Sequence, residues 1–308
     1  MSKGGKSEEA LRALLPASVA VRFDEMFPSL RARTVRRRDR KRADMLRKAE
    51  PVLQRALGPM EVVRFVTSGA RQLAWGLVTA GSMNPFTNRT TFVLTDRRIL
   101  LIHTDRKGRP RMFASQLPLE RIETTSGRHS YIFIRSGREQ LMFHGTKRGE
   151  AKYLRRLLDT TPIDEGGWQN LCPRCFFAMD DAPDTCTGCG EPFKSPRKAA
   201  LRSLVFPGLG DFYLGYRGYA VLQTFGAGLL WAMFLTVLVP AVRARGFEGV
   251  LIALPVLAFV ALVHGGDAIL TWAKARSGLH SRDGALPTGT APAKRDGPPP
   301  VPPAAYAK

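Results

Sequence analysis

The sequence predicts a multidomain α+β membrane protein, and three observations support this fold class. Residues 218–242 carry no charged side chain, and a second charge-free stretch, residues 249–266, resumes after Asp267. Upstream lie a run of short β-type segments and two Cys-x-x-Cys pairs. A helix rises about 1.5 Å per residue and a bilayer core is about 30 Å thick, so each apolar stretch is long enough to span a membrane. Only residues 243–248 separate the two, which predicts a two-helix transmembrane hairpin.

Composition narrows the expected partners and the compartment. With 308 residues and 44% hydrophobic content, the chain is long enough for two or three domains. The formal net charge of +21 predicts anionic partners, namely lipid headgroups, nucleic acid or an acidic protein. Residues 1–50 lack the uninterrupted apolar core of a signal peptide, so the first apolar stretch is expected to target the protein to the membrane. All four cysteines lie between Cys172 and Cys189, which favours a metal in a reduced compartment over disulfides.

Residues 1–58 are expected to form a basic helical arm. An apolar stripe predicts helix over residues 8–57, interrupted at Pro16, Pro28 and Pro51. A basic block follows within the arm, and its candidate lipid- or partner-binding side chains are Arg36, Arg37, Arg38, Arg40, Lys41 and Arg42. Two interpretations of the block stay open. It is either a solvated helix face or a surface that docks on anionic lipid, where each Lys or Arg gains about 1 kcal/mol.

From residue 59 to residue 162 the hydrophobic period changes from helical to strand-like. Seven short β-type runs, separated by turn residues, precede a helix expected at residues 147–159. The runs cover residues 61–67, 73–79, 90–94, 98–103, 111–115, 131–135 and 140–144. This order of elements, and the segments 92–102 and 117–122 in particular, resemble bacterial PH/GRAM-like domains. The resemblance implies a PH-like β-barrel with a C-terminal helix that binds headgroups or protein partners, but it names no ligand. Candidate contacts on strand ends and turns are Arg97, Arg98, Arg106, Lys107, Arg109 and Arg111.

The two cysteine pairs, Cys172/Cys175 and Cys186/Cys189, have the spacing of a tetrahedral metal site. Two residues between thiolates let one tight turn present both sulfurs to a single ion, and two such turns complete the coordination. Gly190 suits the backbone reversal after the second pair. Residues 163–195 resemble a short zinc ribbon, and four thiolates leave no water to activate, so Zn²⁺ is expected to be structural. An iron site or two redox disulfides are the alternatives.

A Pro-Gly-rich segment immediately precedes the first apolar stretch. The candidate membrane motif consists of Pro207, Gly208, Gly210, Tyr213, Gly215 and Asp267. This motif resembles the hallmark of the TM2 family of two-helix membrane domains, and we assign residues 196–275 to such a hairpin. Proline and glycine are expected to break the preceding helix at the membrane surface, so that neighbouring aromatic residues lie in the interfacial belt. Asp267 is either an interfacial residue near a helix end or a functional acid inside the bilayer.

Flanking charge predicts the topology. Lysines and arginines flank the outer ends of both apolar stretches. In the connecting loop, the charges of Arg243 and Arg245 are partly balanced by Glu248. The positive-inside rule therefore predicts an inner (cell) membrane protein with both termini in the cytoplasm. The hairpin also offers a route to homo-oligomers. Residues 276–308 are rich in Pro, Gly and Ala and are expected to be disordered, with a polyproline ligand as the alternative.

The motifs favour attachment over catalysis. The chain lacks the HExxH, GxSxG and phosphate-binding Gly-Lys motifs, so an enzyme is not expected. The first hypothesis is a non-enzymatic membrane adaptor whose PH-like domain binds anionic lipid or a protein. The alternative is a membrane-tethered nucleic-acid-binding or regulatory protein, although Asp180, Asp181 and Asp184 in the cysteine loop would repel phosphates. A third hypothesis is a transport or envelope enzyme component in which Asp267 acts inside the bilayer.

Overall fold

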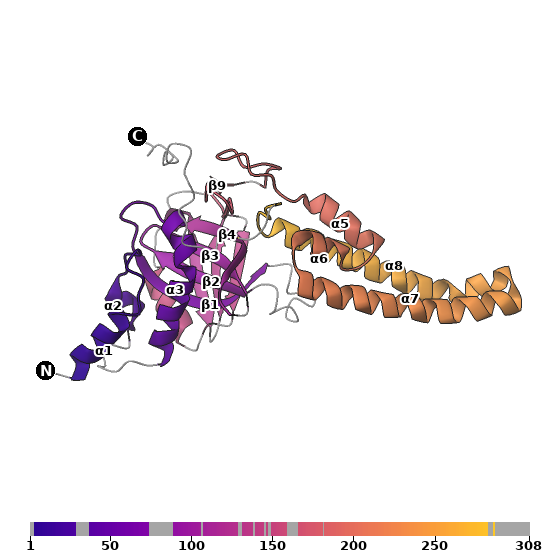
Figure 1. Ribbon diagram of the computed structural model, residues 1–308, viewed down its shortest axis with the longest axis horizontal. Coiled ribbons are helices and arrows are strands. Elements are labelled where there is room, and N and C mark those ends of the chain that lie inside the picture. The colour runs from indigo at the N-terminus through magenta and orange to yellow at the C-terminus, as the bar shows by residue number, and fades with distance from the viewer. Residues whose placement is uncertain are drawn as a thin grey trace. The chain divides into compact units, whose positions relative to one another are not determined.

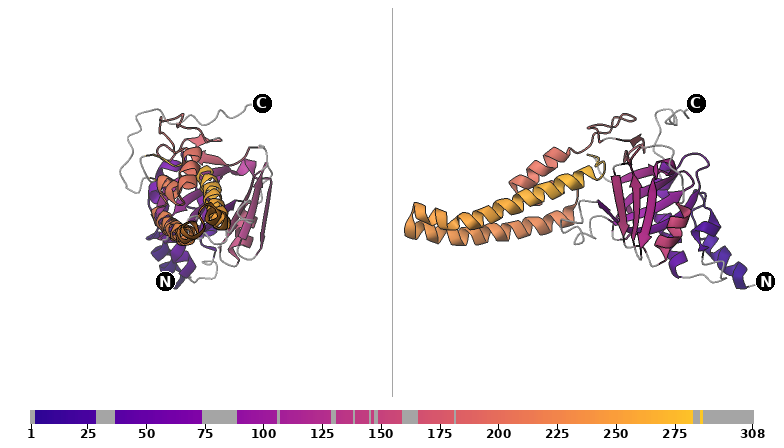
Figure 2. Two further views of the ribbon diagram at one scale, coloured as in Figure 1. Left: turned by 90° about the vertical axis from the view of Figure 1, so that its right-hand side faces the viewer. Right: turned by 180° about the vertical axis from the view of Figure 1, so that it is seen from behind.

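The computed structural model falls into two compact units. We call the first the sheet unit, which contains the described residues up to Glu191 together with Leu286, and the second the hairpin unit, residues 192–282 (Figures 1 and 2). The structure describes residues 3–28, 37–73, 89–105, 107–128, 131–137, 139–144, 146, 149–158, 166–180, 182–282 and 286.

The described strands of the sheet unit form one nine-stranded antiparallel sheet in the order β5-β6-β7-β1-β2-β3-β4-β8-β9. Their bounds are β1 Val63–Leu73, β2 Arg89–Thr95, β3 Arg98–Thr104, β4 Pro110–Pro118, β5 Thr124–Arg128, β6 Tyr131–Ser136, β7 Glu139–His144, β8 Gln169–Leu171 and β9 Ala178–Met179. The expected barrel is not closed, because no pairing between described strands joins the edges β5 and β9.

Most expected strands are present, and the pattern missed β5 as well as the short strands β8 and β9. Expected runs overlap β1 and fall within β2, β3, β4, β6 and β7, whereas the run at 73–79 lies almost wholly outside the described residues. Ser126 and Gly127, expected to form a turn, lie inside β5 and pair with Phe133 and Ile132 of β6. This strand is polar and contains a glycine, so it lacks the apolar pattern from which the other strands were predicted.

Both faces of the central strands are buried, which explains their unbroken apolar runs. One face packs against helix α3 (Arg37–Ala56), which crosses the sheet in Figure 1. The other face packs against β5–β7 and helix α4 (Glu150–Leu157), through a core that includes Phe65, Phe92 and Phe143. A short 3-10 helix, η4 (Leu119–Arg121), links β4 to the second half of the sheet. The curved sheet is therefore covered by a helix on each face.

The predicted N-terminal arm packs onto the sheet unit. Helices α1 (Lys3–Arg12) and α2 (Phe23–Met26) precede α3, and their buried Leu11 and Met26 join the core that α3 covers. Buried positions of α3 recur every three or four residues, as expected for one apolar face. The interruption predicted at Pro51 is wrong, because α3 continues through it to Ala56. The neighbouring Val52 and Leu53 are fully buried, and this packing offsets the hydrogen bond that proline cannot donate.

The cysteine segment continues the sheet. Strand β8 pairs with β4 through Ala114 and Leu171, and β9 then pairs with β8. Within the expected ribbon at residues 163–195, β8 and β9 therefore extend the same sheet.

The hairpin unit is built from four helices, α5 (Pro196–Val205), α6 (Leu209–Leu214), α7 (Arg217–Arg245) and α8 (Phe247–Arg276). Helices α7 and α8 lie side by side and are joined by Gly246 alone (Figure 1). Both are long and apolar enough to span a membrane, and most of their apolar side chains face outward. Phe234, Ala253 and Val260 form the buried contact between the two helices. Such outward apolar faces are typical of helices surrounded by lipid.

The tail expected to be disordered from residue 276 begins with an ordered segment. The N–H of Lys194 donates to the carbonyl of His280 (2.8 Å), and Phe193 forms a β-bridge with Ser281. Leu279 and His280 are buried in the hairpin unit, and Leu286 is buried in the core of the sheet unit. The expectation is therefore wrong for residues 277–282, and the remaining tail, apart from Leu286, lies outside the described residues.

Candidate functional site

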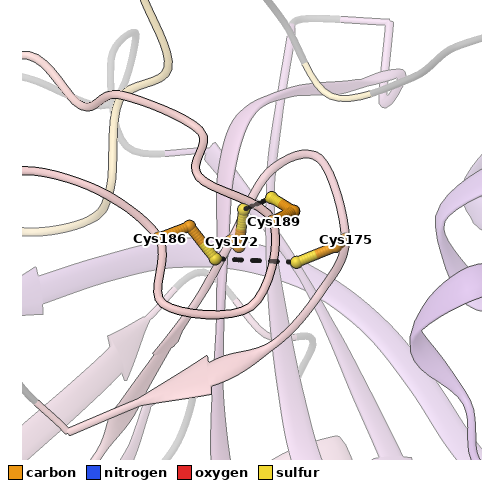
Figure 3. A group of neighbouring side chains, drawn as sticks. All are labelled: Cys172, Cys175, Cys186 and Cys189. Atoms are coloured by element: carbon orange, nitrogen blue, oxygen red, sulfur yellow. Dashed lines mark hydrogen bonds between the residues drawn. The ribbon is translucent and has the colours of Figure 1, made fainter. Parts of the chain in front are cut away.

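The four cysteines come together in one cluster at the end of the sheet (Figure 3). Their sulfur atoms all lie within 4.8 Å of one another, with 3.7 Å between Cys172 and Cys189 and 3.6 Å between Cys175 and Cys186. A disulfide would need about 2.05 Å, whereas sulfurs placed tetrahedrally at about 2.3 Å from an ion lie roughly 3.8 Å apart. The cluster therefore fits a four-thiolate zinc site.

Two turns of the same shape present the sulfurs. In the first, the N–H of Phe176 donates to the carbonyl of Cys172 (2.9 Å), and in the second the N–H of Gly190 donates to the carbonyl of Cys186 (2.9 Å). Phe176 and Gly190 each follow the first cysteine of their pair by four positions, and both have positive φ, at 60° and 72°. The sequence indicated this reversal at Gly190 and gave no sign of it at Phe176. A bulky residue in this conformation requires support from its surroundings, and Phe176 is buried in the core.

The thiols differ in acidity. The hydrogen bond from the Cys172 thiol, with help from the N–H of Phe177, lowers the pKa of Cys175 to about 5, although burial opposes this shift. The same hydrogen bond to Cys175, together with burial, raises the pKa of Cys172. One sulfur is therefore ready to act as a thiolate ligand, while its neighbour would release a proton on binding a metal.

The residues of the membrane motif hold α6 against α7 and α8. Gly208 precedes α6 with φ of 91°, and its N–H donates to Oδ2 of Asp267 (3.0 Å). The side-chain amide of Gln223 donates to the other oxygen of Asp267. A Cβ on Gly208 would lie 2.6 Å from the carbonyl oxygen of Ala220, so the position requires glycine. Asp267 is thus buried inside the helix bundle as an acceptor for the Gly208 turn.

The remaining motif residues also make contacts within the hairpin unit. Pro207 accepts a hydrogen bond from the Thr224 hydroxyl (3.3 Å), and the Tyr213 hydroxyl accepts one from the N–H of Ser195 (3.2 Å). Gly210 lies where α6 approaches α5 and α8, and Gly215 ends α6. The motif therefore serves to dock α6 onto its neighbours.

Two further polar contacts in the hairpin unit were not predicted. Asp211, fully buried, receives both of its hydrogen bonds from Nζ of Lys274, at 2.8 and 2.9 Å. His264 lies between Nε1 of Trp231 (3.1 Å) and the carbonyl of Leu204 (2.9 Å). An indole nitrogen only donates and a carbonyl only accepts, so His264 is neutral with its proton on Nδ1. Both contacts link separate helices, and His264 has no other ligand-like partner among the described residues.

The predicted basic contacts divide into internal and exposed groups. Arg42 is 5% exposed and pairs with Glu150 at 2.8 Å. Its guanidinium also lies over the ring of Phe65. Arg98 is likewise committed inside the fold, so neither arginine is available to a partner. The exposed candidates are Arg37, Arg38, Arg40, Lys41, Arg97, Lys107, Arg109 and Arg111, while Arg36 and Arg106 lie outside the described residues.

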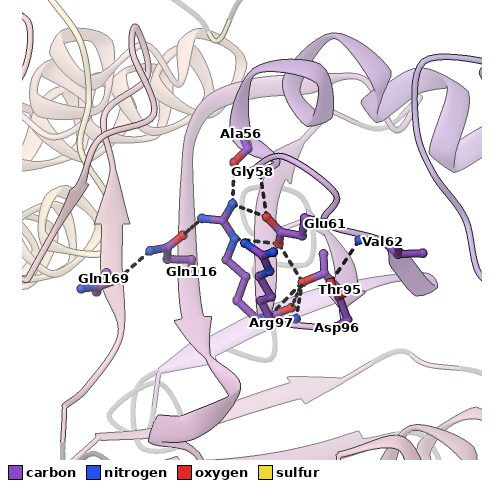
Figure 4. A network of polar contacts seen from close by, with 10 residues as sticks. Ala56, Gly58, Glu61, Val62, Thr95, Asp96, Arg97, Gln116 and Gln169 are labelled. Atoms are coloured by element: carbon purple, nitrogen blue, oxygen red, sulfur yellow. Dashed lines mark hydrogen bonds and ion pairs between the residues drawn. The ribbon is translucent and has the colours of Figure 1, made fainter. Parts of the chain in front are cut away.

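Arg98 makes hydrogen bonds to several parts of the sheet unit, in a network whose labelled members in Figure 4 include Glu61, Gln116 and Gln169. Its guanidinium donates to both oxygens of Glu61, at 2.9 and 2.7 Å, and also to Gln116 and to the carbonyl of Ala56. The side-chain amide of Gln116 in turn donates a hydrogen bond to the side-chain oxygen of Gln169 in β8 (2.6 Å). The network therefore ties the end of α3, β3, β4 and the cysteine segment together.

A groove of about 460 Å³ lies between β5 and α4. Thr124 and Thr125 line one wall, and the exposed Lys152, Arg155 and Arg156 line the other. The groove also contains Glu123, whose charge is paired with Arg135 (3.3 Å). Among the described residues the three cations of α4 have no carboxylate partner, so the groove carries an unbalanced positive charge. No sequence pattern distinguished these cations, because they follow ordinary helical spacing in a chain rich in Lys and Arg.

Comparison of the chain with protein-family models, with curated proteins and with solved structures found no match.

Proposed function

We propose that this protein is a non-enzymatic membrane adaptor whose sheet unit binds an acidic segment of a protein partner in the groove between β5 and α4. The observation that carries this proposal is the row of three cations, Lys152, Arg155 and Arg156, which line a concave wall and have no carboxylate partner in the part of the chain that the structure describes. Clustered cations that lack internal partners attract anionic ligands and speed their association.

The membrane anchor in this proposal is the α7–α8 hairpin. Apolar side chains such as Leu222, Phe225 and Leu262 are exposed on its outer surface. Insertion into a lipid bilayer would bury these side chains away from water. The TM2-like motif supports the same role, since it docks α6 beside the ends of both helices. By the positive-inside rule, both ends of the hairpin face the cytoplasm of an inner membrane.

The strand order supports a PH-like origin for the sheet unit. Strands β1 to β7 precede α4 along the chain, and six of them correspond to runs in the order of elements that suggested the resemblance, while β5 was not expected. The cysteine cluster would hold structural Zn²⁺ through Cys172, Cys175, Cys186 and Cys189, and thereby keep β8 and β9 on the edge of this sheet.

An extended peptide fits the groove better than a flat membrane surface does. Strand β5 pairs only with β6 among the described strands, so it is an edge to which another chain can add. The hydroxyls of Thr124 and Thr125 offer hydrogen bonds along that edge, opposite the cations of α4. Carboxylates at alternate positions of an extended chain would face these cations.

The test uses the full chain in phosphatidylcholine nanodiscs and a fluorescent peptide of alternating glutamate and valine. The variant Lys152→Gln/Arg155→Gln/Arg156→Gln should weaken peptide binding, measured by fluorescence anisotropy, by about tenfold or more, because each lost contact contributes roughly 0.5 kcal/mol. Its matched control is Lys107→Gln/Arg109→Gln/Arg111→Gln, which removes equal charge from an exposed turn and strand. The control should change binding by less than about twofold.

Three outcomes would contradict the proposal. Equal losses in the two triple variants would show that net charge, and not the groove, attracts the peptide. Tighter binding of the wild type to phosphatidylglycerol vesicles through these same cations would favour a lipid ligand. Displacement of the peptide by a single-stranded oligonucleotide at lower concentration would favour the nucleic-acid alternative.

A further inference from the structure

A second group of cations surrounds Tyr213 in the hairpin unit. The guanidinium of Arg202 lies 4.2 Å from the centre of the Tyr213 ring, and Nζ of Lys194 lies 5.9 Å from the same point. Burial, together with the positive charge of Arg217, lowers the pKa of Lys194. Arg202 and Lys194 therefore lie beside one aromatic side chain, and Arg217 is close enough to Lys194 for their charges to repel.

No acidic side chain balances these cations within the described residues of the hairpin unit. Residues 192–282 contain Asp211, Glu248 and Asp267 as their acids. Asp211 pairs with Lys274, and Asp267 accepts from Gly208 and Gln223. Glu248 lies in the first turn of α8, next to the α7–α8 connection and at the opposite end of α7 from Arg217. Among the described residues of this unit, the cations around Tyr213 therefore keep an unbalanced positive charge.

Exposed apolar side chains lie next to the cations. On helix α5, Leu201 is 62% exposed and Val205 is 74% exposed, and Arg202 lies between them in the sequence. The opposite face of α5, with Ala199 and Ser203, is buried, and Ser203 contacts Thr271 of α8 (3.0 Å). Helix α5 therefore presents positive charge and apolar surface together, next to the C-terminal part of α8, where Thr271 lies. A ligand that matches both features carries a negative headgroup and acyl chains.

We propose that Lys194, Arg202 and Arg217 bind the phosphate of an anionic phospholipid, while the apolar side chains of α5 contact its acyl chains. This site belongs to the hairpin unit and is separate from the groove of the sheet unit. Its phosphate contacts are charge-assisted, and its apolar contacts exclude a free phosphate as the natural ligand.

The test compares phosphatidylglycerol with phosphatidylcholine of the same acyl chains, bound to the full chain in detergent and measured by native mass spectrometry. The wild type should bind phosphatidylglycerol at least about tenfold more tightly. Arg202→Gln/Arg217→Gln should reduce this preference to within about twofold, whereas Arg202→Lys/Arg217→Lys, which keeps the charge, should retain most of it. The matched control Arg243→Gln/Arg245→Gln removes two exposed arginines near the α7–α8 connection and should leave the preference unchanged.

Several outcomes would overturn the inference. Equal affinity of the wild type for the two lipids would overturn it, and so would a loss of the preference in the Arg243/Arg245 control as complete as in the Arg202/Arg217 variant. Competition by glycerol phosphate at the same concentration as phosphatidylglycerol would show that the acyl chains contribute nothing. None of these results depends on peptide binding in the groove, so the two proposals fail separately.

Discussion

The sheet unit and the hairpin unit each bury a carboxylate beside one cationic side chain, yet the pKa of the two carboxylates shifts in opposite directions. In the sheet unit, burial alone would raise the pKa of Glu61, but Arg98 and its other donors hold it below the ordinary value of 4.5. In the hairpin unit, burial raises the pKa of Asp211 above 3.8, although Lys274 lies 2.8 Å away and opposes the shift.

The difference follows from the number of donors and the surrounding charge. Glu61 accepts two hydrogen bonds from Arg98, one from the N–H of Gly58 (2.8 Å) and one from the hydroxyl of Thr95 (2.8 Å). Asp211 receives side-chain hydrogen bonds only from Lys274 among the described residues, and the nearby charge of Asp267 raises its pKa further. An ion pair therefore favours the ionised carboxylate only when enough donors replace the lost water.

The largest effect should come from the cysteine cluster, and it tests whether the two units are stabilised independently. Cys186→Ser removes one of the four ligands, and structural Zn²⁺ contributes on the order of 10 kcal/mol in small zinc-binding peptides. Limited proteolysis of the full chain should then show new cleavage within residues 166–191 but none within residues 192–282. Metal analysis of the purified chain should show loss of zinc in parallel.

Thr187→Ser is the matched control, because it changes an exposed side chain in the same turn and keeps all four sulfurs. It should retain zinc and the wild-type cleavage pattern. A wild type without bound zinc would contradict the metal assignment. New cleavage throughout residues 192–282 in Cys186→Ser would show that the hairpin unit depends on the cluster.

Patterns along the chain predicted the parts of this fold that local period and spacing determine. The absence of charge from residues 218–242 and 249–266 predicted α7 and α8, and the paired cysteines predicted their own cluster. Apolar runs predicted six strands, because β-strands buried on both faces read as unbroken hydrophobic segments. These features are determined by residues that are close together along the chain, so they can be predicted from the sequence.

Features that depend on tertiary partners were not predictable from such patterns. Arg42 and Arg98 belonged to clusters of Lys and Arg that looked uniformly exposed, but Glu150 and Glu61, far away in the chain, hold them inside. The positive φ of Phe176 is likewise imposed by the turn and the core around it. A cation becomes structural when the fold brings a distant carboxylate to it, and one sequence alone does not show which cations those are.

The next largest effect should come from breaking the Asp211–Lys274 pair. Asp211→Ala removes both acceptors of the Lys274 ammonium, one of which a protonated Asp211 would keep, and should destabilise the hairpin unit by about 3 kcal/mol, because the Lys274 side chain is only 12% exposed. Asp211→Leu/Lys274→Met replaces both charges with apolar groups and should recover most of that loss. The measurement is the midpoint of unfolding in a titration with sodium dodecyl sulfate.

Glu248→Ala serves as the control, since Glu248 is exposed and makes no ion pair with another described residue. It should change the free energy of unfolding by less than about 0.5 kcal/mol. If the double variant proved less stable than Asp211→Ala, the ion pair would stabilise the unit beyond cancelling its two buried charges. The opposite pKa shifts of Asp211 and Glu61 would then need another explanation.

The smallest expected effect is the response of each unit to acid, and it tests the opposite pKa shifts directly. The folded pKa of Glu61 lies below its unfolded value, so its stabilising contribution is present above about pH 4.5 and is lost as the pH falls through the folded pKa. The folded pKa of Asp211 lies above its unfolded value of 3.8. Its ionised form therefore weakens the fold, and the hairpin unit should gain stability as the pH falls toward 3.8.

Hydrogen-exchange mass spectrometry of the full chain reports on both units in one sample. As the pH falls toward 3.8, the free energy of local opening, derived from protection factors corrected for intrinsic exchange, should decrease in β3 and increase in α6. Glu61→Gln should flatten the response of β3 and leave that of α6 unchanged, whereas Glu120→Gln, an exposed control in the sheet unit, should alter neither. If β3 and α6 lost protection together, the two carboxylates would be titrating in the same direction. The number of hydrogen-bond donors around each carboxylate would then not be what separates the two units.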